Sequence, residues 1–192
     1  MKKVLACLFV LMVVSSSVVF GDGLKSSNNC FSITPRVGVV NSILFFQSSG
    51  GGSSGSMTQG FSGPSLGLDF GYSLLQSLEF IADLNYQNIN YSGAMITGVL
   101  VSGNIAYKFL GLSDWLIPEI GGGYVTGTYS SPSAGIPVNG WKGFCGVTLD
   151  DKFSIKLKYD LLDYMTTWTS SSILYTSKLT FNNLILECGA KF

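Results

Sequence analysis

The sequence predicts an all-β protein, an eight-stranded antiparallel up-and-down transmembrane β-barrel with periplasmic termini. Three observations support this prediction. After residue 30, eight stretches alternate between large apolar residues and small or polar ones, which is the two-residue period of a strand with two different faces. The connections between these stretches are alternately short and long, and the charged residues of the stretches lie opposite the apolar face.

Residues 1–21 have the features of a secretory signal peptide. Two lysines precede an apolar run from Val4 to Val14, and Val19-Phe20-Gly21 offers a cleavage site. We therefore expect residues 22–29 to be a short N-terminal periplasmic segment and residues 30–192 to be the barrel. The alternative is a retained N-terminal anchor, but the apolar run is shorter than the about 20 residues that a spanning helix needs.

The first four strands are predicted over residues 31–39, 66–74, 78–86 and 99–109. The clearest pattern is in residues 66–74, where Leu66, Leu68, Phe70, Tyr72 and Leu74 alternate with Gly67, Asp69, Gly71 and Ser73. A helix would scatter these apolar side chains around its axis, whereas a strand places all of them on one face.

The last four strands are predicted over residues 118–124, 141–149, 153–161 and 184–192, with the same alternation. Short connections are expected at residues 75–77, 110–114 and 150–152, and long Gly/Ser-rich loops at residues 47–63, 88–95, 129–139 and 163–177. Short turns at one end and long loops at the other are typical of outer-membrane barrels, in which the short turns are periplasmic.

The apolar face could point inward, as in a secreted lipocalin-like or sandwich fold, or outward toward lipid. Eight glycines lie on the polar face, where a solvated strand has no reason to give up β-propensity. In the narrow interior of an eight-stranded barrel, glycine makes room for long side chains. Aromatic residues near both strand ends match the two membrane interfaces. The glycines are Gly38, Gly67, Gly71, Gly98, Gly121, Gly123, Gly146 and Gly189.

With the apolar face outward, twelve charged residues point into the barrel. A charge that faced the middle of the bilayer instead would cost about 2–4 kcal/mol. The six positive and six negative charges balance, which predicts an ionic network that fills the lumen. The members are Arg36, Asp69, Glu79, Asp83, Lys108, Glu119, Lys142, Lys156, Lys158, Asp160, Glu187 and Lys191.

The composition argues against several classes of function. Basic and acidic residues are equal in number, at 11 each, with no basic run, so we expect no nucleic-acid partner. The chain has no histidine, the commonest general base, and we expect no enzymatic activity and no cofactor. Cys30, Cys145 and Cys188 are not clustered, so no metal site is expected.

The eight-strand rhythm, the segment from Leu116 to Tyr124 and the C-terminal alternation together make residues 30–192 resemble the small outer-membrane barrels of the OmpA, OmpX and OmpW kind. The C-terminal alternation is similar to the signal by which the barrel-assembly machinery recognises its clients. This resemblance implies a monomer among the outer-membrane lipids of a diderm bacterium. The residues of the expected assembly signal are Leu184, Leu186, Cys188, Ala190 and Phe192.

The charges are not spread evenly along the predicted lumen, because the loop side receives mostly apolar residues. An apolar cup above an ionic floor resembles the OmpW kind of barrel, whose members are associated with small hydrophobic molecules. The first hypothesis is therefore a narrow channel or binding vestibule for such solutes. The cup residues are Val40, Leu44, Leu100, Val125, Phe144, Leu162, Leu179 and Phe181.

The alternative hypothesis is an adhesin or host-interaction barrel that acts through its extracellular loops. The Gly/Ser-rich first loop and the Tyr- or Trp-bearing segments 129–139 and 163–177 would then bind a host surface ligand, and the barrel would only hold them in place.

Overall fold

The computed structural model describes residues 31–91, 94–110, 115–131, 134–170 and 173–192. The expected signal peptide and the expected segment 22–29 lie outside these residues. The described chain forms eight strands: β1 (Phe31–Gly50), β2 (Ser53–Leu75), β3 (Leu78–Tyr91), β4 (Ala94–Lys108), β5 (Leu116–Ser131), β6 (Ala134–Leu149), β7 (Phe153–Ser170) and β8 (Ile173–Ala190).

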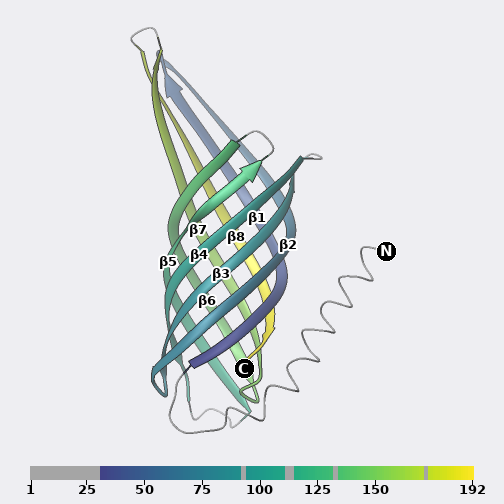
Figure 1. Ribbon diagram of the computed structural model, residues 1–192. Coiled ribbons are helices and arrows are strands. Elements are labelled where there is room, and N and C mark those ends of the chain that lie inside the picture. The colour runs from purple at the N-terminus through teal and green to yellow at the C-terminus, as the bar shows by residue number, and fades with distance from the viewer. Residues whose placement is uncertain (1–30, 92–93, 111–114, 132–133, 171–172) are drawn as a thin grey trace, which may run out of the picture.

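The strands form a closed barrel in which each strand pairs antiparallel with the next and β8 returns to β1 (Figure 1). The β1–β8 ladder runs from Arg36–Gly189 to Ser49–Thr176. Beyond it, the backbones of Ile33 and Phe192 exchange hydrogen bonds of 3.0 and 2.9 Å. The predicted eight-stranded up-and-down architecture is confirmed, and Phe31 and Phe192 lie at the same end, with the short turns.

The apolar side chains face outward, as predicted. Ile120, Leu186 and Trp141 expose 53%, 50% and 67% of their surface, although large apolar residues are normally buried in a soluble protein. The side chains of opposite parity are buried in the lumen. None of the described residues belongs to a helix long and apolar enough to cross a membrane.

All eight strands are longer than expected, and the predicted loops 47–63, 88–95, 129–139 and 163–177 are mostly strand. The four long strands β1, β2, β7 and β8 have 18–23 residues each. Residues 47–50 pair with residues 53–56, and the turn between them contains Gly51 and Gly52 at φ of 60° and 82°. Glycine adopts these left-handed conformations without steric cost. Antiparallel pairing satisfies the backbone here, so the hairpin forms although its side chains are small.

The four long strands leave the closed wall together. The β2–β3 ladder ends at Ser62–Asn90, and the β6–β7 ladder ends at Asn139–Asp163. Above these pairs, β2, β1, β8 and β7 continue as one sheet, which rises beyond the β3–β4 and β5–β6 hairpins (Figure 1). We call residues 43–50, 53–60, 164–170 and 173–180 the projecting sheet.

Candidate functional site in the lumen and the projecting sheet

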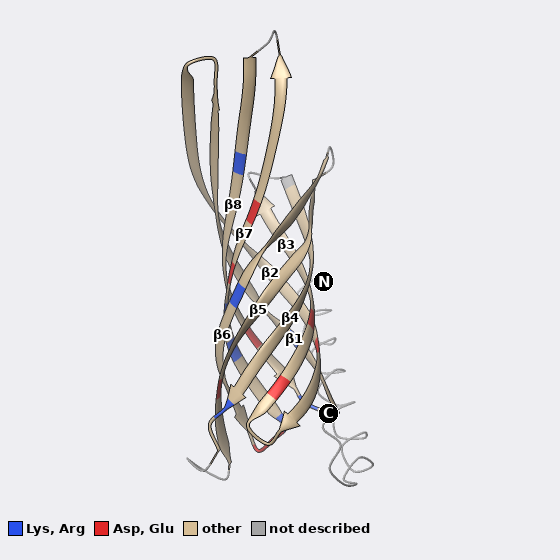
Figure 2. Ribbon diagram, turned by 90° about the vertical axis from the view of Figure 1, so that its left-hand side faces the viewer, with Lys and Arg blue, Asp and Glu red and all other residues tan. Residues whose placement is uncertain are grey.

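The structure places all twelve predicted charges in the lumen. Eleven are buried, and Lys191, at the short-turn end, is partly exposed. Most of the charged positions lie in the barrel below the projecting sheet (Figure 2). Each carboxylate lies within ion-pair distance of at least one cation. Hydration of these groups is thus replaced by ion pairs and hydrogen bonds, as buried charges require.

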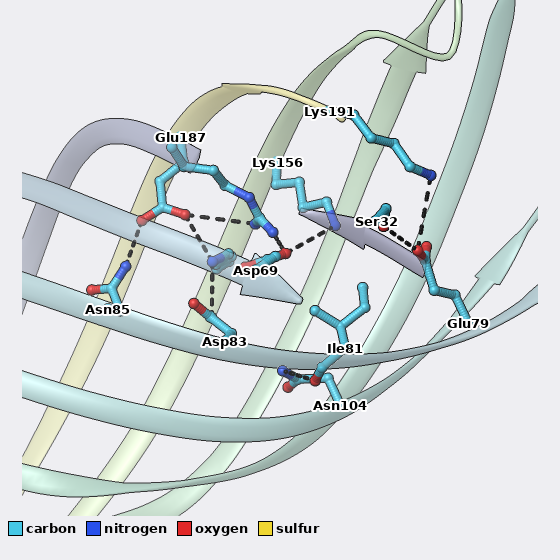
Figure 3. A network of polar contacts seen from close by, with 12 residues as sticks. Ser32, Asp69, Glu79, Ile81, Asp83, Asn85, Asn104, Lys156, Glu187 and Lys191 are labelled. Carbon is cyan, nitrogen blue, oxygen red and sulfur yellow. Dashed lines mark hydrogen bonds and ion pairs between the residues drawn. The ribbon is translucent and has the colours of Figure 1, made fainter. Parts of the chain in front are cut away.

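Two carboxylates organise the upper part of the network. Asp83 accepts hydrogen bonds from Lys142 at 2.7 Å and Lys158 at 2.9 Å. Lys158 also reaches Glu187 at 2.7 Å, and Asn85 donates to Glu187 at 2.6 Å. Figure 3 shows the Glu187 carboxylate joined to Asn85, with Asp69 and Asp83 close by. The shared lysine therefore links strands β3, β7 and β8 across the lumen.

A second group lies toward the short-turn end. Lys108 approaches Glu79 at 2.7 Å, and Ser32 donates to the same carboxylate at 3.0 Å. Lys156 lies 2.8 Å from Glu119 and 3.6 Å from Asp69, which in turn pairs with Arg36. The group encloses a polar cavity of about 20 Å³, which is room for about one water molecule.

The lumen glycines make room for these side chains, as the sequence predicts. A Cβ atom on Gly146 would lie 2.9 Å from Cγ of Lys156, and one on Gly189 would lie 2.7 Å from Cγ of Arg36. At Gly71 it would overlap the Glu79 carboxylate. Both distances are shorter than carbon–carbon contacts allow, so the ionic network depends on the absence of these side chains.

The expected apolar cup is a packed layer. Val40, Leu100, Val125, Leu162 and Phe181 are buried in one cluster, with Leu44 and Leu179 packed against it. The other members are Phe61, Ile89, Tyr129, Val138 and Ile185. Six of these ten core residues have no exposed surface, so this region of the described chain is filled rather than open. The expectation of an open vestibule differs from the structure on this point.

Phe144 is not part of this layer. It packs with Ile81 and Ala106, and its ring lies 4.9 Å from Nζ of Lys156. Its cross-strand partners are Gly121 and Lys158. The predicted place of Phe144 in the apolar cup is therefore wrong, because the height of a residue in the lumen depends on the stagger between neighbouring strands that barrel closure imposes.

The missed members of the packed layer came mainly from segments predicted as loops. Ile89, Tyr129 and Val138 lie in predicted loops, and Phe61 lies in the first one. Ile185 could have been predicted from the alternation, because it lies between the inward residues Asn183 and Glu187 on β8.

Tyr129 joins the apolar layer to the polar network. Its ring stacks on Phe181, with centroids 4.6 Å apart. Its hydroxyl donates to Gln87 at 2.7 Å and accepts from Asn183 at 2.7 Å. A single side chain thus belongs to both layers.

The expected assembly residues Leu184, Leu186, Cys188 and Ala190 share the outer face of β8. Leu184, Leu186 and Cys188 are exposed and Phe192 is partly exposed, but Ala190 is only 5% exposed. Its short methyl group lies opposite the larger Phe153 in the β7–β8 ladder. Cys145 and Cys188 are free thiols on the outer wall, and the described residues contain no cluster of three potential metal ligands.

The projecting sheet is almost uncharged. Of residues 43–60 and 164–180, only Lys178 carries a charge, and it pairs with Asp163 at 3.3 Å on the outer surface. On the other face, the rings of Trp168 and Tyr175 stack 5.6 Å apart with an interplanar angle of 11°. The sheet therefore offers hydroxyl groups, aromatic rings and backbone groups rather than charges.

No protein-family model matches the sequence, and no curated protein matches it. Among solved structures, the chain is similar to Neisserial surface protein A, with a TM-score of 0.52 and 13% identity over 86% of this chain and 100% of that one. The fold is that of a small eight-stranded outer-membrane barrel. The chain also matches the N-terminal barrel domain of Pseudomonas aeruginosa OprF, with a TM-score of 0.39 and 15% identity over 86% of this chain and 100% of that one. A third match is Ail, the attachment invasion locus protein of Yersinia pestis, with a TM-score of 0.36 and 11% identity over 82% of this chain and 98% of that one.

Proposed function

We propose that the protein is an outer-membrane barrel that acts at the cell surface, where its projecting sheet binds a ligand on a host or another surface. The observation that carries the proposal is the contrast between the two halves of the molecule. The lumen is filled by an ionic network and an apolar layer, while four strands continue beyond the wall as a free-standing sheet.

The outer wall supports the location in a membrane. Along β7 the unbroken run of outward apolar residues ends at Leu161, and the next outward residue is Asp163, paired with the half-exposed Lys178. Such a pair belongs in water, because a charge in the hydrocarbon costs about 2–4 kcal/mol. We therefore place the lipid boundary below Asp163, with the projecting sheet outside the cell and both described ends in the periplasm.

A narrow channel for small hydrophobic solutes is the competing function. It requires a path past Val40, Leu100 and Leu162, which have no exposed surface. Opening this layer would expose apolar side chains, at a cost of about 25 cal/mol for each Å². The packing therefore favours the surface role over conduction.

The test is to shorten both long hairpins while the barrel wall stays intact. Residues 46–57 and 166–177 are each replaced by Asn-Gly, which closes a two-residue hairpin turn next to the Phe45–Thr58 and Met165–Lys178 pairs. Cells of a non-adherent bacterium that display each form are then counted on cultured animal cells and on immobilised matrix proteins. We expect the full chain to increase retention of the bacteria and the shortened chain to lose that increase.

Two controls separate surface binding from folding. Heat-modifiable gel migration shows whether the shortened chain still forms a barrel. Leu100→Ala changes the packed layer and leaves the projecting sheet intact, so it should keep full retention. Equal retention by the full and shortened chains, both folded, would rule out the surface role.

A further inference from the structure

Among the described residues, no strand lies beside one edge of the projecting sheet. From Tyr164–Leu179 to Ser170–Ile173, β7 pairs with β8, but within the described residues its ladder with β6 stops at Asn139–Asp163. Two residues further along β6 is Pro137, which has no N–H to donate and is confined to sheet edges and bulges. Along residues 164–170, every second residue therefore turns its backbone N–H and C=O away from β8 to an open edge.

This edge lacks the features by which proteins prevent strand pairing. Exposed edges are usually protected by lysine, proline or a bulge, or by being very short. Residues 164–170 read Tyr-Met-Thr-Thr-Trp-Thr-Ser, with no charge and no proline, and Tyr, Thr and Trp all favour strands. The opposite edge, Ser53–Gly60 of β2, contains Gly55 and Gly60, which weaken a strand.

The side chains along the β7 edge define what kind of strand fits. Trp168 is 47% exposed beside its stacked neighbour Tyr175 on one face, and Met165 is 66% exposed on the other. A strand added here would place its own side chains next to these residues, and aromatic or β-branched cross-strand pairs are the favourable ones. No charge on residues 164–170 is available to pair with a charged partner.

We propose that the β7 edge, residues 164–170, binds an uncharged extended peptide segment of a partner protein by β-strand addition. The segment forms main-chain hydrogen bonds to the open edge and places aromatic or β-branched side chains beside Trp168. This inference rests on the proposed surface function and names the edge and the chemistry of the partner. Main-chain bonds of this kind give affinity, and the neighbouring side chains give selectivity.

Amide hydrogen exchange on the folded chain in lipid nanodiscs tests the proposal. Without a partner, alternate amides of residues 164–170 should exchange fast, because only those bonded to β8 are protected. The probe is a capped eight-residue peptide of alternating threonine and valine with one central tryptophan. At saturation it should slow the fast amides at least tenfold, and the same peptide with two central prolines should not.

Two substitutions sharpen the result. Trp168→Thr keeps the backbone edge but removes the aromatic neighbour, so it should weaken peptide binding by up to about fivefold, as expected for one cross-strand pair. The matched control is Tyr124→Thr, an exposed aromatic residue on the outer wall, which should leave peptide binding unchanged. Equal effects of the two substitutions would overturn the side-chain part of the proposal.

The remaining outcomes each overturn the inference. Protection that appears on Ser53–Gly60 instead would assign the site to β2, and unchanged exchange would mean that the β7 edge binds no strand. Protection that rises with protein concentration without peptide would make a second copy the partner. Shortening the hairpins could abolish retention on cells while the peptide leaves the exchange of all amides unchanged. That result would support the surface function and contradict strand addition.

Discussion

The side-chain amide of Asn183 on β8 donates a hydrogen bond of 2.7 Å to the hydroxyl of Tyr129 on β5, three strands away in the ring. This bond holds the boundary between the ionic network and the apolar layer, because the same hydroxyl donates to Gln87 and the same ring stacks on Phe181.

Tyr129→Phe should lower the free energy of unfolding by about 1–3 kcal/mol, because it leaves the buried polar groups of Asn183 and Gln87 without a partner. The measurement is urea-induced unfolding in lipid vesicles. Tyr124→Phe removes a hydroxyl from the exposed outer wall and should change little. Equal losses for the two variants would show that the hydroxyl of Tyr129 has no special role.

Asp83→Asn should lower the free energy of unfolding by about 3–5 kcal/mol, because it leaves the buried Lys142 and Lys158 without this carboxylate. The measurement is again urea-induced unfolding in lipid vesicles. Adding Lys158→Met should recover part of the loss, because it removes the excess positive charge that the missing carboxylate leaves in the lumen. The exposed pair offers the control: Asp163→Asn should cost no more than about 1 kcal/mol. If the double variant is no more stable than Asp83→Asn, the loss does not come from excess positive charge in the lumen.

Gly98→Ala should destabilise the barrel by about 1–3 kcal/mol through overpacking, because the new methyl group would lie 2.9 Å from Cδ1 of Tyr129. Gly143→Ala is the matched change on the outer wall, where no atom lies within 4 Å. It should be neutral or stabilise by up to about 1 kcal/mol through the unfolded chain. Thermal or urea unfolding measures the stability of both variants. A similar loss of stability in each would contradict the close packing around Tyr129.

The wild-type barrel should show no steady ion conductance in planar bilayers, because both lumen layers are packed. Leu100→Ala should lower the free energy of unfolding by about 2–5 kcal/mol without changing the retention of bacteria on cultured cells. Steady conductance of the wild-type chain that Leu100→Ala increases would instead support the solute channel.

The fold and the ionic lumen could be predicted because both depend on local alternation. Any strand that turns Leu66, Leu68 and Phe70 to one face turns Gly67 and Asp69 to the other, whatever the rest of the chain does. The height of Phe144 could not be read in this way, because it depends on the stagger between neighbouring strands.

The sequence alone also could not predict that the upper lumen is filled. Whether Val40 and Leu100 line a cavity depends on the volume that Phe61 and Tyr129 add, and these two residues lie in segments without clear alternation. The long hairpins were missed for a related reason. Their Gly, Ser and Thr residues show no apolar face, although their backbones pair fully with each other.

The close fit between Gly98 and Tyr129 has an evolutionary consequence, because the three atoms nearest the missing Cβ all belong to the tyrosine side chain. A larger residue at Gly98 is tolerated only when residue 129 becomes smaller at the same time, so inherited changes at these two positions must come as a compensating pair. Positions on the outer wall such as Gly143 meet no such restriction and are free to drift one at a time.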